Sequence, residues 1–192
     1  MEPFWLSAVT VAVAEIGDKT QLLAIVLAAK FRRPVPIILG ILAATLLNHA
    51  AAAGLGFLAG ALLKGRVFQI CVGLAFVAMA AWALVPDKEE EEATLDRRRA
   101  GGVLLTTLIT FFLVEIGDKT QIATSLLAAR FHQITLVAAG TTLGMMAANV
   151  PAVLLGEVAA KRIPLKLVRM AAAVIFGILG AVAVVGALTH GG

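Results

Sequence analysis

The chain has 192 residues, of which 60% are hydrophobic and only 15% charged, and its formal net charge at pH 7 is +4. A mean hydropathy of +0.97 excludes an ordinary water-soluble domain. The positive excess is small and scattered between apolar stretches, so it does not indicate a nucleic-acid partner. We therefore expect an integral membrane protein whose surroundings are the lipid bilayer.

Six apolar stretches follow one another along the chain, each bounded by charged residues or proline. They cover residues 3–29, 35–63, 67–85, 103–129, 134–160 and 165–188. Each has about the 20 residues that a helix needs to cross the hydrocarbon core. Barrel strands are excluded because these stretches are too long and too rich in alanine and leucine. The sequence thus predicts an all-α polytopic membrane protein with six transmembrane helices.

Basic residues are distributed unequally between the connections that join these six predicted helices. The second and fourth connections contain only Lys64, Arg66 and Arg130. The first, third and fifth contain Lys30, Arg32, Arg33, Lys88, Arg97, Arg98, Arg99, Lys161, Arg162, Lys166 and Arg169. Because basic residues accumulate on the cytoplasmic side, we expect the odd-numbered connections in the cytoplasm. Both termini then lie on the opposite side of the cell (inner) membrane.

The heptapeptide Glu-Ile-Gly-Asp-Lys-Thr-Gln occurs twice without a change, at residues 15–21 and 115–121. The same offset relates Gly40 to Gly140, so the repeated unit is about half the chain. We expect two three-helix repeats, residues 1–86 and 102–192, joined by a charged cytoplasmic linker at residues 87–101. Three crossings per repeat make the second repeat run in the opposite direction to the first. Such inverted repeats are common in transporters, with the substrate near the midplane where the repeats meet.

The linker and the single cysteine are open to simple interpretations. Four consecutive glutamates at residues 89–92 form either a solvated loop or a segment that collects or senses cations. The single cysteine, Cys71, lies in an apolar stretch, so no disulfide framework exists and a packing role is the simpler one.

Each copy of the heptapeptide places polar side chains in the middle of a predicted transmembrane helix. In a helix, Glu15, Asp18 and Gln21 project toward one side, as do their counterparts 100 residues later. Lys19 follows Glu15 by four residues, which favours an ion pair within the helix. Gly17 permits either an unwound segment or the close approach of another helix. The candidate metal-binding residues are Glu15, Asp18, Gln21, Glu115, Asp118 and Gln121, with Lys19 and Lys119 as charge-balancing residues.

Charged side chains at this depth are expensive, which argues against a purely structural role. Three central charges cost about 7.5–10 kcal/mol on an insertion scale. The eleven Leu, Ile, Val and Phe residues from Phe4 to Leu27 return only about 3–7 kcal/mol. Apolar packing would hold a bundle together equally well, so a site shared by the two copies is the better explanation.

The ligand atoms that the two copies offer are all oxygens, with no thiolate or imidazole among them. This set suits hard divalent cations such as Ca²⁺, Mn²⁺ or Mg²⁺. Four carboxylates and two lysines leave two negative charges, which one divalent cation or two protons would balance. This balance suits exchange of a divalent cation for protons. Further polar residues that could complete the coordination are Thr20, Asn48, Thr120 and Asn149.

The pattern of motifs and predicted helices resembles that of a known family. Paired Glu-x-Gly-Asp-Lys-Thr motifs in the first and fourth of six helices, with an acidic central loop, are similar to the Gdt family of Ca²⁺/Mn²⁺ transporters. The resemblance covers the whole chain. It implies that Glu15, Asp18, Glu115 and Asp118 bind the cation. It also implies export of Mn²⁺ or Ca²⁺ from the cytoplasm in exchange for protons, with the cation as substrate and without a cofactor.

Other functions remain as alternatives. A passive divalent-cation channel would conduct without counter-transport. An intramembrane hydrolase would need two differentiated carboxyl groups, whereas the two motifs are identical, so we expect no enzyme. His49 is either a packed polar residue or a proton relay. Two pairs of glycines spaced by four residues, Gly56 with Gly60 and Gly140 with Gly144, predict close helix contacts.

Overall fold

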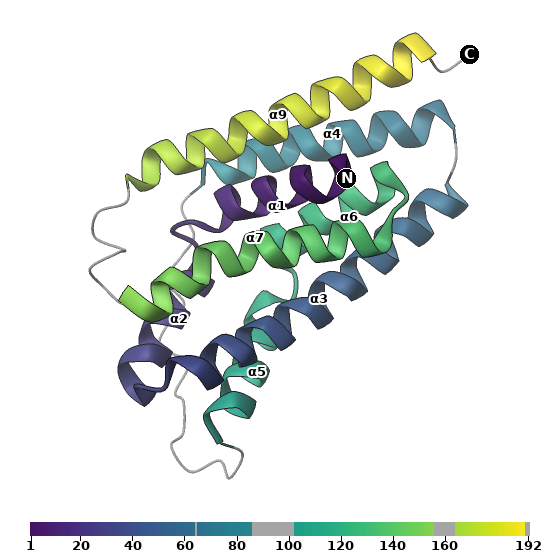
Figure 1. Ribbon diagram of the computed structural model, residues 1–192. Coiled ribbons are helices and arrows are strands. Elements are labelled where there is room, and N and C mark those ends of the chain that lie inside the picture. The colour runs from purple at the N-terminus through teal and green to yellow at the C-terminus, as the bar shows by residue number, and fades with distance from the viewer. Residues whose placement is uncertain (64, 86–101, 156–163, 191–192) are drawn as a thin grey trace.

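The computed structural model describes residues 1–63, 65–85, 102–155 and 164–190, and these ranges contain eight α-helices (Figure 1). The first half of the chain contributes α1 (Glu2–Glu15), α2 (Lys19–Phe31), α3 (Pro34–Leu62) and α4 (Arg66–Ala83). The second half contributes α5 (Gly102–Glu115), α6 (Lys119–Phe131), α7 (Ile134–Leu155) and α9 (Leu165–His190). The expected all-α fold is therefore confirmed over the described part of the chain.

Four of these helices are long enough and apolar enough to cross a membrane. They are Pro34–Leu62, Arg66–Ala83, Ile134–Leu155 and Leu165–Thr189. They match the second, third, fifth and sixth stretches predicted from hydropathy. The linker at residues 87–101 with its glutamates 89–92, and the basic residues Lys64, Lys88, Arg97, Arg98, Arg99, Lys161 and Arg162, lie outside the described residues.

The first and fourth predicted helices are each interrupted in the middle. The α1 helix ends at Glu15 and α2 begins at Lys19, and the same break separates α5 from α6. At each break a glycine has a positive φ angle, +81° at Gly17 and +78° at Gly117. Side chains with a Cβ rarely adopt this conformation, so glycine permits the chain to leave the helix here. Both roles considered for Gly17 are present, because the segment is unwound and the side chain of Leu165, at the start of α9, occupies the space that a Cβ on Gly17 would need.

The two halves of the chain are packed into each other rather than side by side. In Figure 1, α1 lies along α7, α3 lies along α5 and α6, and α4 lies along α9. Each interrupted pair of helices is thus held against a long helix of the other half. This arrangement brings the two heptapeptides toward the centre of the bundle.

Glycines make several of these contacts unusually close, including the two at which the four-residue spacing predicted it. A Cβ on Gly144 of α7 would overlap the Ala8 carbonyl of α1. A Cβ on Gly56 of α3 would overlap the Ser125 carbonyl of α6. The predicted close helix contacts are therefore confirmed, and they join opposite halves of the chain.

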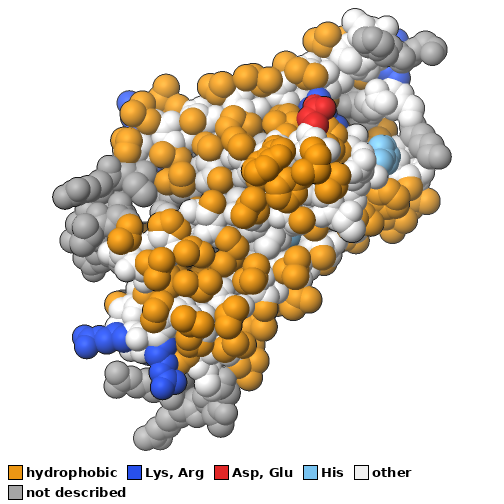
Figure 2. Space-filling view, in the orientation of Figure 1, with side chains coloured by type: hydrophobic (Ala, Val, Ile, Leu, Met, Phe, Trp, Pro, Cys, Tyr) orange, Lys and Arg blue, Asp and Glu red, His pale blue; other side chains and the backbone are white. Residues whose placement is uncertain are grey.

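Apolar residues fill the space between the helices and also cover the outside. Phe76 of α4 stacks on Phe176 of α9, with ring centroids 6.4 Å apart, inside one apolar cluster. A second cluster joins α2, α3, α5 and α7 around Phe111. The face in Figure 2 is mostly hydrophobic, with charged side chains gathered toward its ends. Such a surface suits lipid contact along the body of the molecule.

Candidate metal centre

Each heptapeptide forms the junction between two helices, and an aspartate begins the second helix of each pair. Asp18 is the N-cap of α2, and Asp118 is the N-cap of α6. Aspartate is favoured at this position because its oxygens can accept hydrogen bonds from the first turn. Two helix N-termini, which carry partial positive charge, therefore face the carboxylates of the junctions.

The glutamine that ends each heptapeptide stabilises the break. Gln21 Oε1 accepts a hydrogen bond from the Gly17 backbone N–H at 2.8 Å, and Gln121 Oε1 accepts one from Gly117 at 2.7 Å. Gln21 Nε2 also donates to the Ala148 carbonyl of α7 at 3.1 Å. Both predicted ligand oxygens thus already hold the backbone of their own junction, through the N–H of the residue that precedes the N-cap.

Three carboxylates from the two heptapeptides meet in the interior. One oxygen from each of Glu15, Asp18 and Asp118 lies within 4.8 Å of the others, and all three residues are buried. Oxygens on opposite sides of a Ca²⁺ ion stand about 4.6–5.2 Å apart, twice the usual Ca–O distance. The cluster is therefore compact enough for one divalent cation to contact all three carboxylates.

The fourth carboxylate, that of Glu115, does not belong to this cluster among the described residues. Its Oε2 accepts a hydrogen bond from Asn48 Nδ2 at 3.2 Å, and its Oε1 lies 3.0 Å from His49 Nε2. Glu15 has one such partner, because its Oε1 accepts a hydrogen bond from Asn149 Nδ2 at 3.3 Å. In both cases a long helix of the opposite half supplies the asparagine.

The two threonines that could complete the coordination, Thr20 and Thr120, also differ in their contacts. Thr120 donates to Asp118 Oδ2 from its backbone N–H at 3.3 Å and from its hydroxyl at 3.1 Å. The hydroxyl of Thr20 is buried, and no described residue forms a hydrogen bond with it. Thr120 therefore fixes its aspartate in place, whereas the Thr20 hydroxyl remains available to a ligand.

The lysines do not form the predicted pair along one helix. That prediction placed Glu15 and Lys19 one turn apart, but α1 ends at Glu15 and α2 starts at Lys19, so the helical register is broken. Lys19 Nζ instead lies 3.6 Å from Asp118 Oδ1 of the other half. Lys119 Nζ donates to the Val85 carbonyl at 3.3 Å and lies 5.7 Å from the centroid of the Trp82 ring. The same break also overturns the expectation that Glu15, Asp18 and Gln21 share one helix face.

A small cavity adjoins the carboxylate cluster. It measures about 20 Å³ and is lined by Gly17, Asp18, Lys119 and residues of α4 and α9, including Arg169. This volume is enough for about one water molecule. The space beside Asp18 is therefore sized for a water molecule or a dehydrated ion rather than for an organic substrate.

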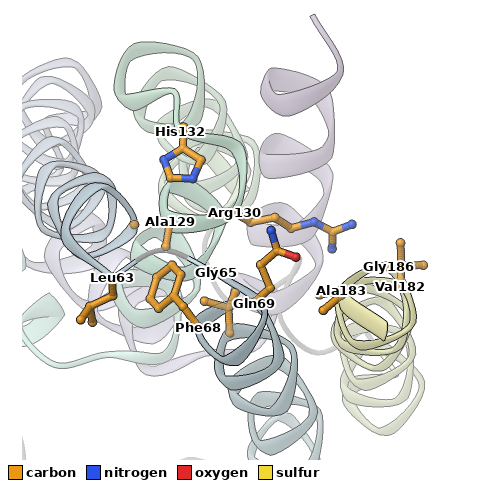
Figure 3. Close-up of a pocket in the computed structure, with 13 residues that line it drawn as sticks. Leu63, Gly65, Phe68, Gln69, Ala129, Arg130, His132, Val182, Ala183 and Gly186 are labelled. Atoms are coloured by element: carbon orange, nitrogen blue, oxygen red, sulfur yellow. The ribbon is translucent and has the colours of Figure 1, made fainter. Parts of the chain in front are cut away.

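A larger cavity of about 380 Å³ lies away from the carboxylates, near the turns that follow α3 and α6. Figure 3 shows Arg130, Gln69 and His132 around it. Arg130 Nη1 donates to the Leu179 carbonyl at 2.8 Å. The described lining residues carry this guanidinium and no carboxylate, so the cavity does not suit a divalent cation.

Two features of the site did not follow from the residue pattern. The first feature is the pair of helix breaks. An unwound segment was one of the two roles predicted for Gly17, and the glycine within each repeated motif was the only sequence signal for it. The contact between His49 and Glu115 joins residues that are 66 positions apart. The sequence signal for this second feature was a difference between the polar residues of the two long helices. Asn48 and His49 are adjacent in one of them, whereas the other has only Asn149 as their counterpart.

Comparison with known proteins supports the resemblance noted from the motifs. The family described as "Divalent cation/proton antiporter GDT1" matches the chain twice, at residues 3–91 and 103–191. A Vibrio cholerae protein named "Putative manganese exporter" is 47% identical over 172 residues, which cover 89% of this chain and 84% of that protein.

A more distant relative is a GDT1-like protein of Synechocystis, which is 27% identical over 203 aligned residues that cover 90% of this chain. No solved structure matches the chain. The two family matches nevertheless cover most of the sequence, and each contains one copy of the heptapeptide. The chain therefore belongs to the GDT1 family of divalent cation/proton antiporters, a family of membrane transporters.

Proposed function

We propose that this protein exports Mn²⁺ from the cytoplasm in exchange for protons, and that the cation binds between the two heptapeptides. The observation that carries this proposal is the approach of the Glu15, Asp18 and Asp118 carboxylates to within 4.8 Å of one another. Hard oxygen ligands suit Mn²⁺ and Ca²⁺ alike. Mn²⁺ is placed first because the relative that is 47% identical is named for manganese.

Charge balance supports the exchange of one divalent cation for two protons. Glu15, Asp18, Glu115 and Asp118 together carry four formal negative charges, and Lys19 and Lys119 carry two positive ones. The remaining two negative charges are buried away from water, where an uncompensated charge is very costly. The empty site therefore gains from binding two protons, and these must leave when a divalent cation enters.

The transport architecture that we propose has six crossings arranged as two inverted repeats. Each interrupted pair, α1 with α2 and α5 with α6, would count as one crossing with its break near the midplane. The mutual packing of the halves and the duplicate family match support this topology. Broken helices whose ends face a central ion site are a recurring feature of such transporters.

The direct test is exchange in proteoliposomes with a pH dye and a Mn²⁺-sensitive dye inside. An acidic lumen should drive Mn²⁺ uptake against its own gradient. Exchange of two protons for each Mn²⁺ predicts about a 100-fold cation gradient for each unit of pH difference. A Mn²⁺ gradient alone should in turn change the lumenal pH, because linkage is reciprocal.

The same measurement separates an antiporter from the alternative, a passive channel. A channel would let Mn²⁺ flow down its gradient with no change in lumenal pH once electrical balance is provided. That outcome would overturn the proposal of proton exchange. Repeating the assay with Ca²⁺ in place of Mn²⁺ ranks the two cations.

Substitution of Lys19 tests whether its charge tunes cation binding. In Lys19→Gln, Asp118 Oδ1 loses a cation that lies 3.6 Å away, so the site becomes more negative. We expect a KM for Mn²⁺ that is lower by up to about tenfold, together with a lower kcat because release slows. Initial rates at varied Mn²⁺ measure both, with Lys30→Gln at the other end of α2 as the control. An increase in KM would contradict this role.

A further inference from the structure

The two heptapeptides are identical in sequence, but their glutamates have different surroundings. Both Glu15 and Glu115 are the last residue of a half-length helix, and both are fully buried. Each faces an asparagine of the opposite half, Asn149 and Asn48 respectively. Within the described part of the chain, Glu115 but not Glu15 also faces an imidazole, that of His49.

This difference decides which carboxylate oxygens are available to a cation. Both oxygens of Glu115 have a neighbour at 3.0–3.2 Å. His49 Nε2 lies beside Oε1, and Asn48 Nδ2 donates a hydrogen bond to Oε2. In Glu15 only Oε1 has such a neighbour. Among the described residues neither Glu15 Oε2 nor Glu115 Oε1 forms a hydrogen bond, but Glu115 Oε1 lies within ion-pair distance of His49 Nε2, and Glu15 Oε2 has no such neighbour. A buried carboxylate oxygen without a partner is costly, and a bound cation would remove that cost.

The origin of the difference lies in the long helices. In α3 the polar residues Asn48 and His49 are adjacent, whereas in α7 Asn149 stands between Ala148 and Val150. Both asparagines are also shared with a backbone carbonyl, since Asn149 Nδ2 lies 3.1 Å from the Met145 carbonyl and Asn48 Nδ2 lies 3.1 Å from the Phe112 carbonyl. What distinguishes Glu115 is its additional contact with His49, although the heptapeptides themselves are the same.

We propose that His49 is a positioning residue that holds Glu115 out of the cation site, so that Glu15 is a direct cation ligand and Glu115 is not. This inference rests on the proposed function, because it concerns the same carboxylate cluster. It assigns unequal roles to two residues that the sequence repeat presents as equivalent. The cation site then consists of Glu15, Asp18 and Asp118, and Glu115 is bound within the protein.

Equilibrium binding of Mn²⁺ to the purified protein, measured from the electron paramagnetic resonance signal of free Mn²⁺, tests this assignment. We expect Glu15→Gln to weaken binding by about tenfold or more, as expected for loss of a ligand. Glu115→Gln removes the same charge from the same motif and is the matched control. Its Mn²⁺ affinity should fall several-fold less than that of Glu15→Gln, because a nearby charge is lost but no ligand.

Substitutions of His49 test the positioning role itself. His49→Leu removes the contact with Glu115 Oε1 and frees that carboxylate to turn toward the cluster. Affinity for Mn²⁺ should then rise roughly tenfold, because each added carboxylate strengthens such sites. The gain should vanish in the His49→Leu/Glu115→Gln double variant, and a double-mutant cycle measures this coupling. His49→Gln retains a side-chain N–H donor and should restore the wild-type affinity.

Several results would overturn this inference. Equal losses of affinity in Glu15→Gln and Glu115→Gln would make both glutamates ligands. An affinity for Mn²⁺ that is the same in His49→Leu with and without Glu115→Gln would remove the positioning role. If the wild-type protein bound no Mn²⁺ in this assay, the proposed function would fail and the inference with it. Wild-type binding with equal losses in the two glutamine variants would overturn only the inference.

Discussion

Replacement of Asp18 by asparagine is expected to slow Mn²⁺ transport by about 100-fold or more. Asp18 supplies one of the three clustered carboxylates, and it borders the small cavity beside them. Asparagine has nearly the same shape and offers one carbonyl oxygen, but it carries no negative charge. The variant should therefore bind the cation weakly and should also lose a site for the exchanged protons.

The substitution should leave folding intact, which is what makes it informative. Asp18 is the N-cap of α2, and asparagine is as good an N-cap as aspartate. Initial rates of Mn²⁺ uptake in proteoliposomes measure the loss, and the thermal unfolding of the purified variant checks the fold. Glu2→Gln, at the exposed start of α1, removes a carboxylate far from the cluster and serves as the control. Near-normal transport by Asp18→Asn would indicate that the buried charges have a structural role rather than a role in cation binding.

Much of the fold could be predicted because hydropathy and helix length obey simple physical limits. The long helices α3, α4, α7 and α9 lie in four of the six predicted apolar stretches. The interruptions in the other two stretches were harder to predict, because an apolar stretch with a central glycine is equally compatible with a continuous helix. What distinguishes the two outcomes is the φ angle at Gly17 and Gly117, which depends on tertiary contacts such as that of Gln21 with Ala148.

The candidate site, like the fold, could be predicted only in part. Duplication of the heptapeptide and the inference of inverted repeats predicted that carboxylates from both copies would lie close together, as Glu15, Asp18 and Asp118 do. The same reasoning treated the copies as equivalent and could not place Glu115 apart from the others. That placement depends on His49, which lies in a different helix and has no histidine counterpart in the second half.

The close contacts between the halves explain why the site needs both repeats in a single compact bundle. The carboxylates come from the junctions of both interrupted pairs, and each pair is positioned by a long helix of the opposite half. A small shift of α3 against α6 would therefore move Asp118 relative to Asp18. In lipid, such helix contacts depend on packing between small residues, because lipid chains are as apolar as the side chains themselves.

Replacement of Gly56 by leucine is accordingly expected to destabilise the protein by about 3 kcal/mol or more and to abolish Mn²⁺ transport. The Cβ of any residue at this position would overlap the Ser125 carbonyl of α6, and backbone atoms cannot move aside as a flexible side chain can. The helices would have to separate, which would also break the hydrogen bond of 3.0 Å from Ser125 Oγ to the Ala52 carbonyl. Unfolding of the purified variant in mixed micelles measures the loss of stability.

Gly54→Leu provides the matched control, because the same change is made two residues away in the same helix. A Cβ at Gly54 would meet no described atom within 4 Å, so leucine there should point outward and leave packing unchanged. Helix propensity alone would make both substitutions slightly favourable, by about 1 kcal/mol for each glycine replaced. The sign of the effect should therefore differ between the two positions. A stable and active Gly56→Leu variant would show that α3 and α6 tolerate separation, and that the halves need not be closely packed to form the carboxylate cluster.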